Sequence, residues 1–156
     1  MLRISRLTDY GTMILVHLAS QQGRVCSASD VAATTHVALP MVQKILKLLA
    51  RAGLIVSARG ADGGYALGRA PESITAADIV NVLEGPIAIT ECSHSDSHCE
   101  LESLCQVGGA WQKINKAIRM ALNDITLAHL TRPARELPVL GLTHGISRTL
   151  GRPERN

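Results

Sequence analysis

A chain of 156 residues is long enough for one domain with its own core and an extension, but too short for two large domains. Aromatic residues make up only 2% of the chain and Phe is absent, so the core must be aliphatic, which favours helices over an aromatic-rich sandwich. The net charge of +3 is unevenly distributed, because residues 1–69 carry +5, residues 70–105 carry −7 and residues 106–156 carry +5. The basic N-terminal part suggests a polyanionic partner, although such runs also occur as solvated faces.

The sequence predicts a cytoplasmic protein. The apolar run over residues 13–19 is short and contains His17, unlike a signal peptide, and no stretch approaches the roughly 20 apolar residues of a membrane helix. In a reducing compartment the four cysteines are expected to bind metal or to act as redox groups rather than to form disulfides. Cys26 lies apart from the other three and is interpreted as a small, half-buried residue.

Three helices are predicted in the first third of the chain. Apolar residues at helical spacing indicate a first helix over residues 5–21. Ser27 and Asp30 form a capping-box pattern that opens a short second helix. Pro40 suits the first turn of a third helix, which Gly53 ends.

The third predicted helix has an apolar side and a cationic side. Val42, Ile45, Leu46 and Leu49 point in one direction, whereas Lys44, Lys47 and Arg51 point almost oppositely. A short helix, a turn and a second helix with a polar ridge predict a helix-turn-helix, whose second helix enters the major groove of DNA. The cations alone would equally suit a surface helix kept soluble by charge. Base contacts are expected from Met41, Gln43 and Lys44, and phosphate contacts from Lys47, Arg51 and Arg59.

A β-hairpin is predicted directly after this helix. Residues 54–59 and 65–68 have strand patterns, and the glycine-rich residues 60–64 between them form the turn. A hairpin in this place is a wing. Arg59 lies at its tip, where a guanidinium can reach a phosphate or the minor groove.

Two further helices follow. Thr75 and Asp78 form a second capping-box pattern, opening a short helix expected to pack beneath the wing. A heptad-like stripe predicts a helix over residues 106–131. The stripe could pack on its own domain, but pairing with a second copy is favoured because the first lobe is small. Its residues are Trp111, Ile114, Ile118, Leu122 and Ile125. The predicted organisation is a winged helix-turn-helix domain over residues 1–85, a cluster-binding loop over 86–105, a dimerisation helix over 106–131 and a flexible tail over 132–156. The predicted fold class is mainly α.

An acidic loop contains Cys92, Cys99 and Cys105, with six and then five residues between successive cysteines. These gaps are too wide for the two-residue knuckle of most structural zinc sites, but one compact loop can bring three thiolates onto a single centre. An iron-sulfur cluster therefore fits better than zinc, although zinc completed by His94 or His98 remains an alternative. A cysteine enzyme is not expected, because no oxyanion site is indicated and the DNA-binding half would have no purpose.

Several phrases of the sequence resemble one family. They are LTDYG at residues 7–11, AGLIVSARGADGGYALGR at 52–69, ITAADIVNVLEG at 74–85, the three loop cysteines and NDIT at 123–126. Together they resemble the bacterial winged-helix repressors that include the iron-sulfur cluster regulator IscR and the nitric-oxide sensor NsrR. The opening MLRISRLTDYG most resembles members that regulate the SUF operon for iron-sulfur cluster assembly.

The resemblance implies a homodimeric repressor that binds operator DNA and senses an iron-sulfur cluster, with a 2Fe-2S cluster favoured over 4Fe-4S. It implies cluster ligation by Cys92, Cys99 and Cys105. The IscR pattern has a histidine three residues after the last cysteine, where this chain has Gly108. Asp9 matches the aspartate that the other subunit donates in NsrR-like members, and His94 and His98 remain rival fourth ligands. A nitric-oxide or redox signal is the alternative within this family.

Overall fold

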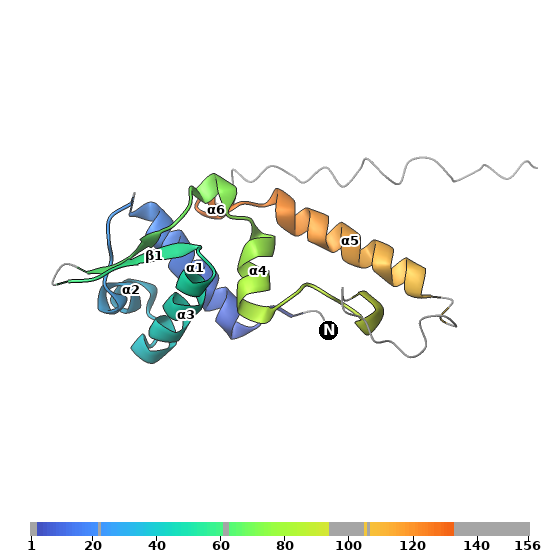
Figure 1. Cartoon of the computed structure of the whole chain (residues 1–156), viewed down its shortest axis with the longest axis horizontal. Coiled ribbons are helices and arrows are strands. Elements are labelled where there is room, and N and C mark those ends of the chain that lie inside the picture. The colour runs from blue at the N-terminus through green and yellow to red at the C-terminus, as the bar shows by residue number, and fades with distance from the viewer. Residues whose placement is uncertain (1–2, 22, 61–62, 94–104, 106, 133–156) are drawn as a thin grey trace, which may run out of the picture.

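The computed structural model describes residues 3–21, 23–60, 63–93, 105 and 107–132. Figure 1 shows helices α1 (Arg6–Ser20), α2 (Ala28–Thr35) and α3 (Leu39–Arg51) gathered with a hairpin in one lobe. Helix α4 (Ala76–Glu84) flanks this lobe, and helix α5 (Gly108–Asp124) extends away from it. The predicted class, mainly helical with a hairpin wing, is confirmed.

The helices begin where the capping residues of the sequence place them. The Ser5 hydroxyl accepts a hydrogen bond from the Thr8 N–H, and Ser27 and Asp30 form a reciprocal capping box at α2. Helix α3 has no side-chain cap and instead carries Pro40 in its first turn. All three predicted helices are therefore present, with ends within two residues of the prediction.

The core between these helices is aliphatic, as the composition predicted. Fully buried side chains come from α1, α3, the first strand, α4 and the residues shortly before that strand and before α4. They include Ile14, Leu15, Leu18, Ile45, Leu46, Leu49, Leu54, Ile55, Ile74 and Ile79. Each such side chain stabilises the fold by roughly 1.5–3 kcal/mol relative to its exposed state. Burial of one side of α3 thus fixes which side remains outside.

The wing consists of β1 (Ile55–Ala58) and β2 (Gly64–Leu67), which pair antiparallel. A backbone bridge joins the wing to the segment before α2, since the Cys26 and Tyr65 N–H groups each donate to the other's carbonyl, at 2.9 and 2.8 Å. A Cβ atom at Gly64 would overlap the Cys26 carbonyl. Glycine therefore permits this close approach.

Helix α4 packs against α1, α3 and α5 rather than beneath the wing, so that part of the prediction is wrong. Its N-terminus is fixed by the predicted capping box of Thr75 and Asp78. A 3-10 turn, η1 (Pro71–Ser73), precedes it, and the segment after its C-terminus leads to a second one, η2 (Glu91–Ser93). No helix in the described ranges is long and apolar enough to cross a membrane.

The single helix predicted over residues 106–131 is wrong in its extent. Helix α5 ends at Asp124, Ile125 is extended with φ −95° and ψ 118°, and a separate short helix, α6 (Leu127–Leu130), follows. The reason is tertiary pairing: the Ala76 N–H donates to the Ile125 carbonyl at 2.8 Å, and the Leu127 N–H donates to the Ile74 carbonyl at 2.7 Å. With Leu127 fully buried, α6 belongs to the core of the lobe that α1–α3 and the hairpin form.

The end of α4 also holds the start of α1. The Ser5 N–H donates to Glu84 Oε1 at 2.9 Å. The Thr8 hydroxyl and the Ser5 N–H lower the pKa of Glu84, because both favour the charged carboxylate. This contact positions the helix turn that carries Asp9.

The lowered pKa of Glu84 predicts a pH-dependent contribution to stability. The charged form stabilises the folded state fully above the ordinary pKa of 4.5, and the contribution is lost as the pH falls through the lower folded-state value. Glu84→Gln should therefore lower the free energy of unfolding near pH 7 by at most about 1 kcal/mol, because the group is exposed and screened, and should have less effect near pH 3. Urea unfolding across this pH range measures it. The exposed Glu72→Gln serves as control, and a pH-independent difference for Glu84→Gln would contradict the assignment.

Candidate DNA-binding face and cysteine site

Helix α3 presents a cationic side to solvent. Lys44, Lys47 and Arg51 are exposed, opposite the buried side of the helix, as the wheel predicted. Gln43 is exposed beside them. Met41 is half-buried and packs against the core, so only part of its side chain is available to a partner.

Leu39 was missed by the sequence reasoning. It begins α3 and is 38% exposed, although a leucine at a helix start would ordinarily be assigned to the core. The sequence feature that could have predicted the exposure of Leu39 is its position outside the apolar stripe of the helix. An exposed apolar side chain there suits contact with a thymine methyl group.

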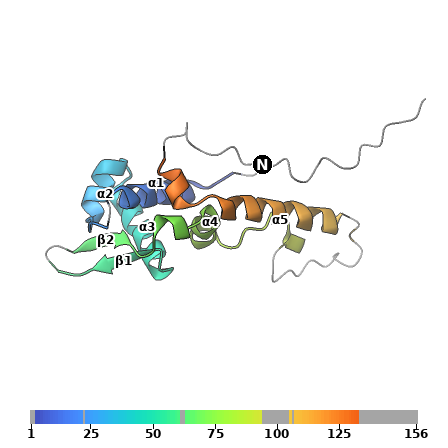
Figure 2. The same ribbon diagram turned by 90° about the horizontal axis from the view of Figure 1, so that it is seen from above.

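The wing projects from the lobe at the end opposite α5 (Figure 2). Arg59 directly follows β1 and is exposed, and Gly60 next to it has φ +116°. The positive φ is a conformation that glycine adopts readily, so the chain can turn immediately after the arginine. Arg59 thus lies where the hairpin begins to reverse, as predicted.

The cysteine loop is only partly within the described residues. Cys92 lies in η2, which packs against α5, and Cys105 is half-buried three residues before α5 begins. Cys99, His94 and His98 lie outside the described residues, as does the predicted tail after Arg132. A Cβ atom placed on Gly108 would be 3.6 Å from the Cys105 sulfur, so a side chain at this position would reach the thiol.

Asp9 is exposed in the first turn of α1. Over the part of the chain that the structure describes, no three His, Cys, Asp or Glu side chains gather at a possible metal site.

The donor residues fit an iron-sulfur cluster. Thiolates are the ligands that such clusters take, and Cys105 lies three residues before the N-terminal end of α5, toward which the free backbone N–H groups give a positive field. No side chain from the described ranges caps this end of α5. Residues 70–105 contain no Lys or Arg that would pair with the thiolates.

Asn115 is a second residue that the sequence reasoning missed. It is 4% exposed and donates from Nδ2 to the carbonyls of Ile87 and Ser93, at 3.2 and 3.4 Å. The available signal was its spacing, four residues after Trp111 and three before Ile118, which places it on the apolar stripe. A polar residue at such a position is expected to be buried and hydrogen-bonded.

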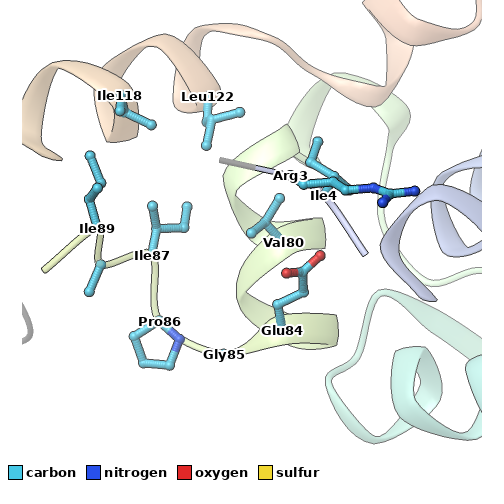
Figure 3. A pocket seen from close by; sticks show the side chains of 11 residues that line it. Arg3, Ile4, Val80, Glu84, Gly85, Pro86, Ile87, Ile89, Ile118 and Leu122 are labelled. Atoms are coloured by element: carbon cyan, nitrogen blue, oxygen red, sulfur yellow. The ribbon is translucent and has the colours of Figure 1, made fainter. Parts of the chain in front are cut away.

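The stripe of α5 does not face a single neighbour. Trp111 and Ile114 are 40% and 45% exposed, whereas Ile118 and Leu122 line a cavity of about 420 Å³ beside α4. Figure 3 shows Ile118 and Leu122 pointing from α5 toward Ile87, Ile89 and Val80 across this space. The remaining lining residues are Arg3, Ile4, Glu84, Gly85, Pro86 and Ala88.

Comparison with known proteins identifies the family. The Rrf2 family, described as iron-dependent transcriptional regulators, matches residues 4–133. The chain belongs to the Rrf2 family. It is 35% identical over 130 residues to the HTH-type transcriptional regulator CymR of Bacillus subtilis, covering 83% of this chain and 89% of that protein. It is 31% identical over 138 residues to Protein rrf2 of Nitratidesulfovibrio vulgaris, covering 88% and 92% respectively.

Solved structures of Rrf2 regulators share the fold. The structure of CymR, the global cysteine regulator of B. subtilis, superposes with a TM-score of 0.66 at 35% identity, covering 84% of this chain and 97% of that one. The structure of T. potens IscR superposes with a TM-score of 0.59 at 33% identity, covering 81% and 84%. The Rrf2 chain described here is thus a transcriptional regulator, and the resemblance to the IscR family is confirmed.

The two described free thiols should differ in reactivity. Cys26 is 8% exposed, and burial, with a smaller effect of Asp30, raises the pKa of its thiol, whereas Cys105 is half-buried at a helix end. Because the thiolate is the nucleophile, iodoacetamide should alkylate Cys105 at least about tenfold faster than Cys26 in metal-free protein. Peptide mass spectrometry over time measures both rates. Equal rates, or faster labelling of Cys26, would contradict this difference, and a Cys26→Ser variant checks the peptide assignment.

Proposed function

We propose that this Rrf2 regulator is a DNA-binding repressor of the SUF operon and acts in the cytoplasm. An iron-sulfur cluster held by Cys92, Cys99 and Cys105 would control its affinity for the operator DNA. One observation carries this proposal. Cys105 lies three residues before the first residue of α5, and the other end of α5 is fixed to the DNA-binding lobe by the backbone bonds at Ile74 and Ala76. A rigid helix thus runs between the thiol and the lobe.

The cluster content tests the function directly. Protein purified without oxygen should be brown and contain about two iron and two sulfide ions per chain, the content of a 2Fe-2S cluster. A colourless protein with bound zinc would replace the cluster with the zinc alternative. Protein without metal would favour a second candidate, regulation by cysteine supply, which the 35% identity to the global cysteine regulator CymR supports. A nitric-oxide or redox signal would act on the same cluster.

DNA recognition is proposed for α3 and the wing. Gln43 can pair with adenine and Lys44 with guanine in the major groove, while Met41 offers an apolar contact. Lys47, Arg51 and Arg59 are assigned to phosphates, which fix the register of the protein on the duplex.

Arg59→Ala should weaken operator binding and reduce the slope of log K against log salt by about one unit, because one phosphate contact is lost. Fluorescence anisotropy at several salt concentrations measures this slope. Arg119→Ala, which removes an exposed arginine on α5, is the matched control and should leave the slope unchanged. An unchanged slope in Arg59→Ala would remove Arg59 from the interface.

A homodimer is proposed through α5. The exposed Trp111 and Ile114 and the cavity beside Ile118 and Leu122 lie along one helix. A two-fold axis can therefore place the protruding side chains of one copy against the hollow of the other. The pair would also present two recognition helices, one turn of DNA apart.

Ile114→Glu should convert the dimer to a monomer at micromolar concentration, because a charge would be buried without a partner in an apolar interface. Sedimentation velocity gives the mass directly. Lys113→Glu adds the same side chain at the next position, which points away from the apolar stripe, and should remain dimeric. A dimeric Ile114→Glu protein would place the interface elsewhere.

Asp9 from the partner subunit is proposed as the fourth cluster ligand. Asp9→Ala should therefore shorten the lifetime of the cluster in an iron chelator by about tenfold or more, and Gly108→His in the same chain should restore it, because a side chain at position 108 reaches the Cys105 sulfur. Visible absorption follows the cluster. His94→Ala and His98→Ala are the comparison variants, and loss of the cluster in one of these but not in Asp9→Ala would assign the ligand to that histidine.

A further inference from the structure

Asn115 is a buried polar residue on a largely exposed part of α5. Its neighbours in sequence, Ile114 and Lys116, are both exposed, whereas Asn115 itself is 4% exposed. A buried amide costs free energy unless its hydrogen-bonding groups are satisfied. Here Oδ1 is buried and has no hydrogen-bond partner in the described part of the chain. An apolar side chain at this position would avoid this cost. The hydrogen bonds that Nδ2 donates are therefore the reason for an asparagine here.

The two donor contacts of Asn115 lie on either side of one segment. Nδ2 donates to the Ile87 carbonyl at 3.2 Å and to the Ser93 carbonyl at 3.4 Å. Ile87 lies just after α4, and Ser93 directly follows Cys92. A single side chain therefore holds both ends of the connection between α4 and the first loop cysteine.

The turn that Asn115 holds, η2, is itself closed by hydrogen bonds between Thr90 and Ser93. In η2 the Ser93 N–H donates to the Thr90 carbonyl at 2.9 Å, and the hydroxyls of Thr90 and Ser93 are 2.8 Å apart. Because these bonds fix the backbone on both sides of Cys92, attaching Ser93 to α5 also attaches the Cys92 backbone to α5. Cys105 stands three residues before the first residue of the same helix.

We infer that Asn115 is a positioning residue for the cluster. It sets the turn that carries Cys92 against the helix that Cys105 precedes, so that two ligand-bearing backbones are placed before iron binds. This inference rests on the proposed function. Preorganised ligands bind metal more tightly. Partners that hydrogen-bond the ligands themselves are worth about 10- to 100-fold in affinity, and a residue that holds the ligand backbone is expected at the lower end of this range.

Two variants and two measurements test this role. Asn115→Leu removes the donors but keeps the branching at Cγ and the number of non-hydrogen atoms, and Asn115→Asp keeps the shape but places a carboxylate oxygen against the two carbonyls. Both should lose the cluster to an iron chelator about tenfold faster than wild type, as followed by visible absorption. In cluster-free protein, hydrogen exchange of a peptide covering residues 86–93 should also accelerate about tenfold, while exchange in α3 is unchanged. Asn81→Ala, at an exposed asparagine of α4, is the control.

The outcomes separate the inference from the proposed function. Wild-type protein that contains the cluster, together with variants whose cluster lifetime and peptide exchange are unchanged, would overturn only the role of Asn115. Exchange that accelerates equally in α3 and in residues 86–93 would also overturn it, because Asn115 would then stabilise the whole fold. Wild-type protein without iron would overturn the proposed function and this inference with it.

Discussion

The architecture depends on a short backbone pairing between residues 74–76 and 125–127. These bonds, at 2.7 and 2.8 Å, stop the long helix at Asp124 and bury Leu127 in the core of the DNA-binding lobe. Helix α5 is thereby a rod of 17 residues, about 25 Å long, with one end fixed. Its N-terminal end lies three residues after Cys105 and the helix packs against η2, so binding at that thiol can act on the lobe through a rigid element.

Two fixed points support this arrangement. Glu84 ties the end of α4 to the start of α1, and Asn115 ties the segment after α4 to α5. The turn that carries Asp9 is thus held by the C-terminal end of α4, and the turn that carries Cys92 is held by α5. In a two-fold dimer, a cluster that bridges Asp9 of one copy and the loop of the other would bias the relative placement of the two lobes.

The sequence predicted the DNA-binding lobe well because its signals are local. Capping boxes at Ser27 and Thr75, the apolar period of α3 and the glycines of the wing each act within a few residues, and each matches the structure. The end of α5 could not be predicted in this way. Ile125 continues the helical stripe, but its backbone pairs with a segment about 50 residues away. The spacing of apolar residues along a helix does not reveal such long-range pairing.

In the candidate site, too, the features set by local sequence were predicted and those set by tertiary packing were not. The exposed cations of α3 followed from the helical wheel, whereas the exposure of Leu39 and the two hydrogen bonds of Asn115 depend on which neighbours pack nearby. A fourth ligand from another subunit depends on assembly, which periodicity within one chain does not encode. Asp9 is proposed as this ligand by resemblance, and its exposure on α1 leaves it accessible to a second copy.

Cluster occupancy is the quantity on which this account depends. Operator affinity should therefore be measured on one anaerobic preparation, using a duplex with the SUF promoter, before and after the cluster is removed by a chelator. The account predicts affinities that differ by about tenfold or more, a coupling of about 1.4 kcal/mol between the cluster and DNA. Affinities equal within about twofold, in protein that still binds the duplex, would contradict it.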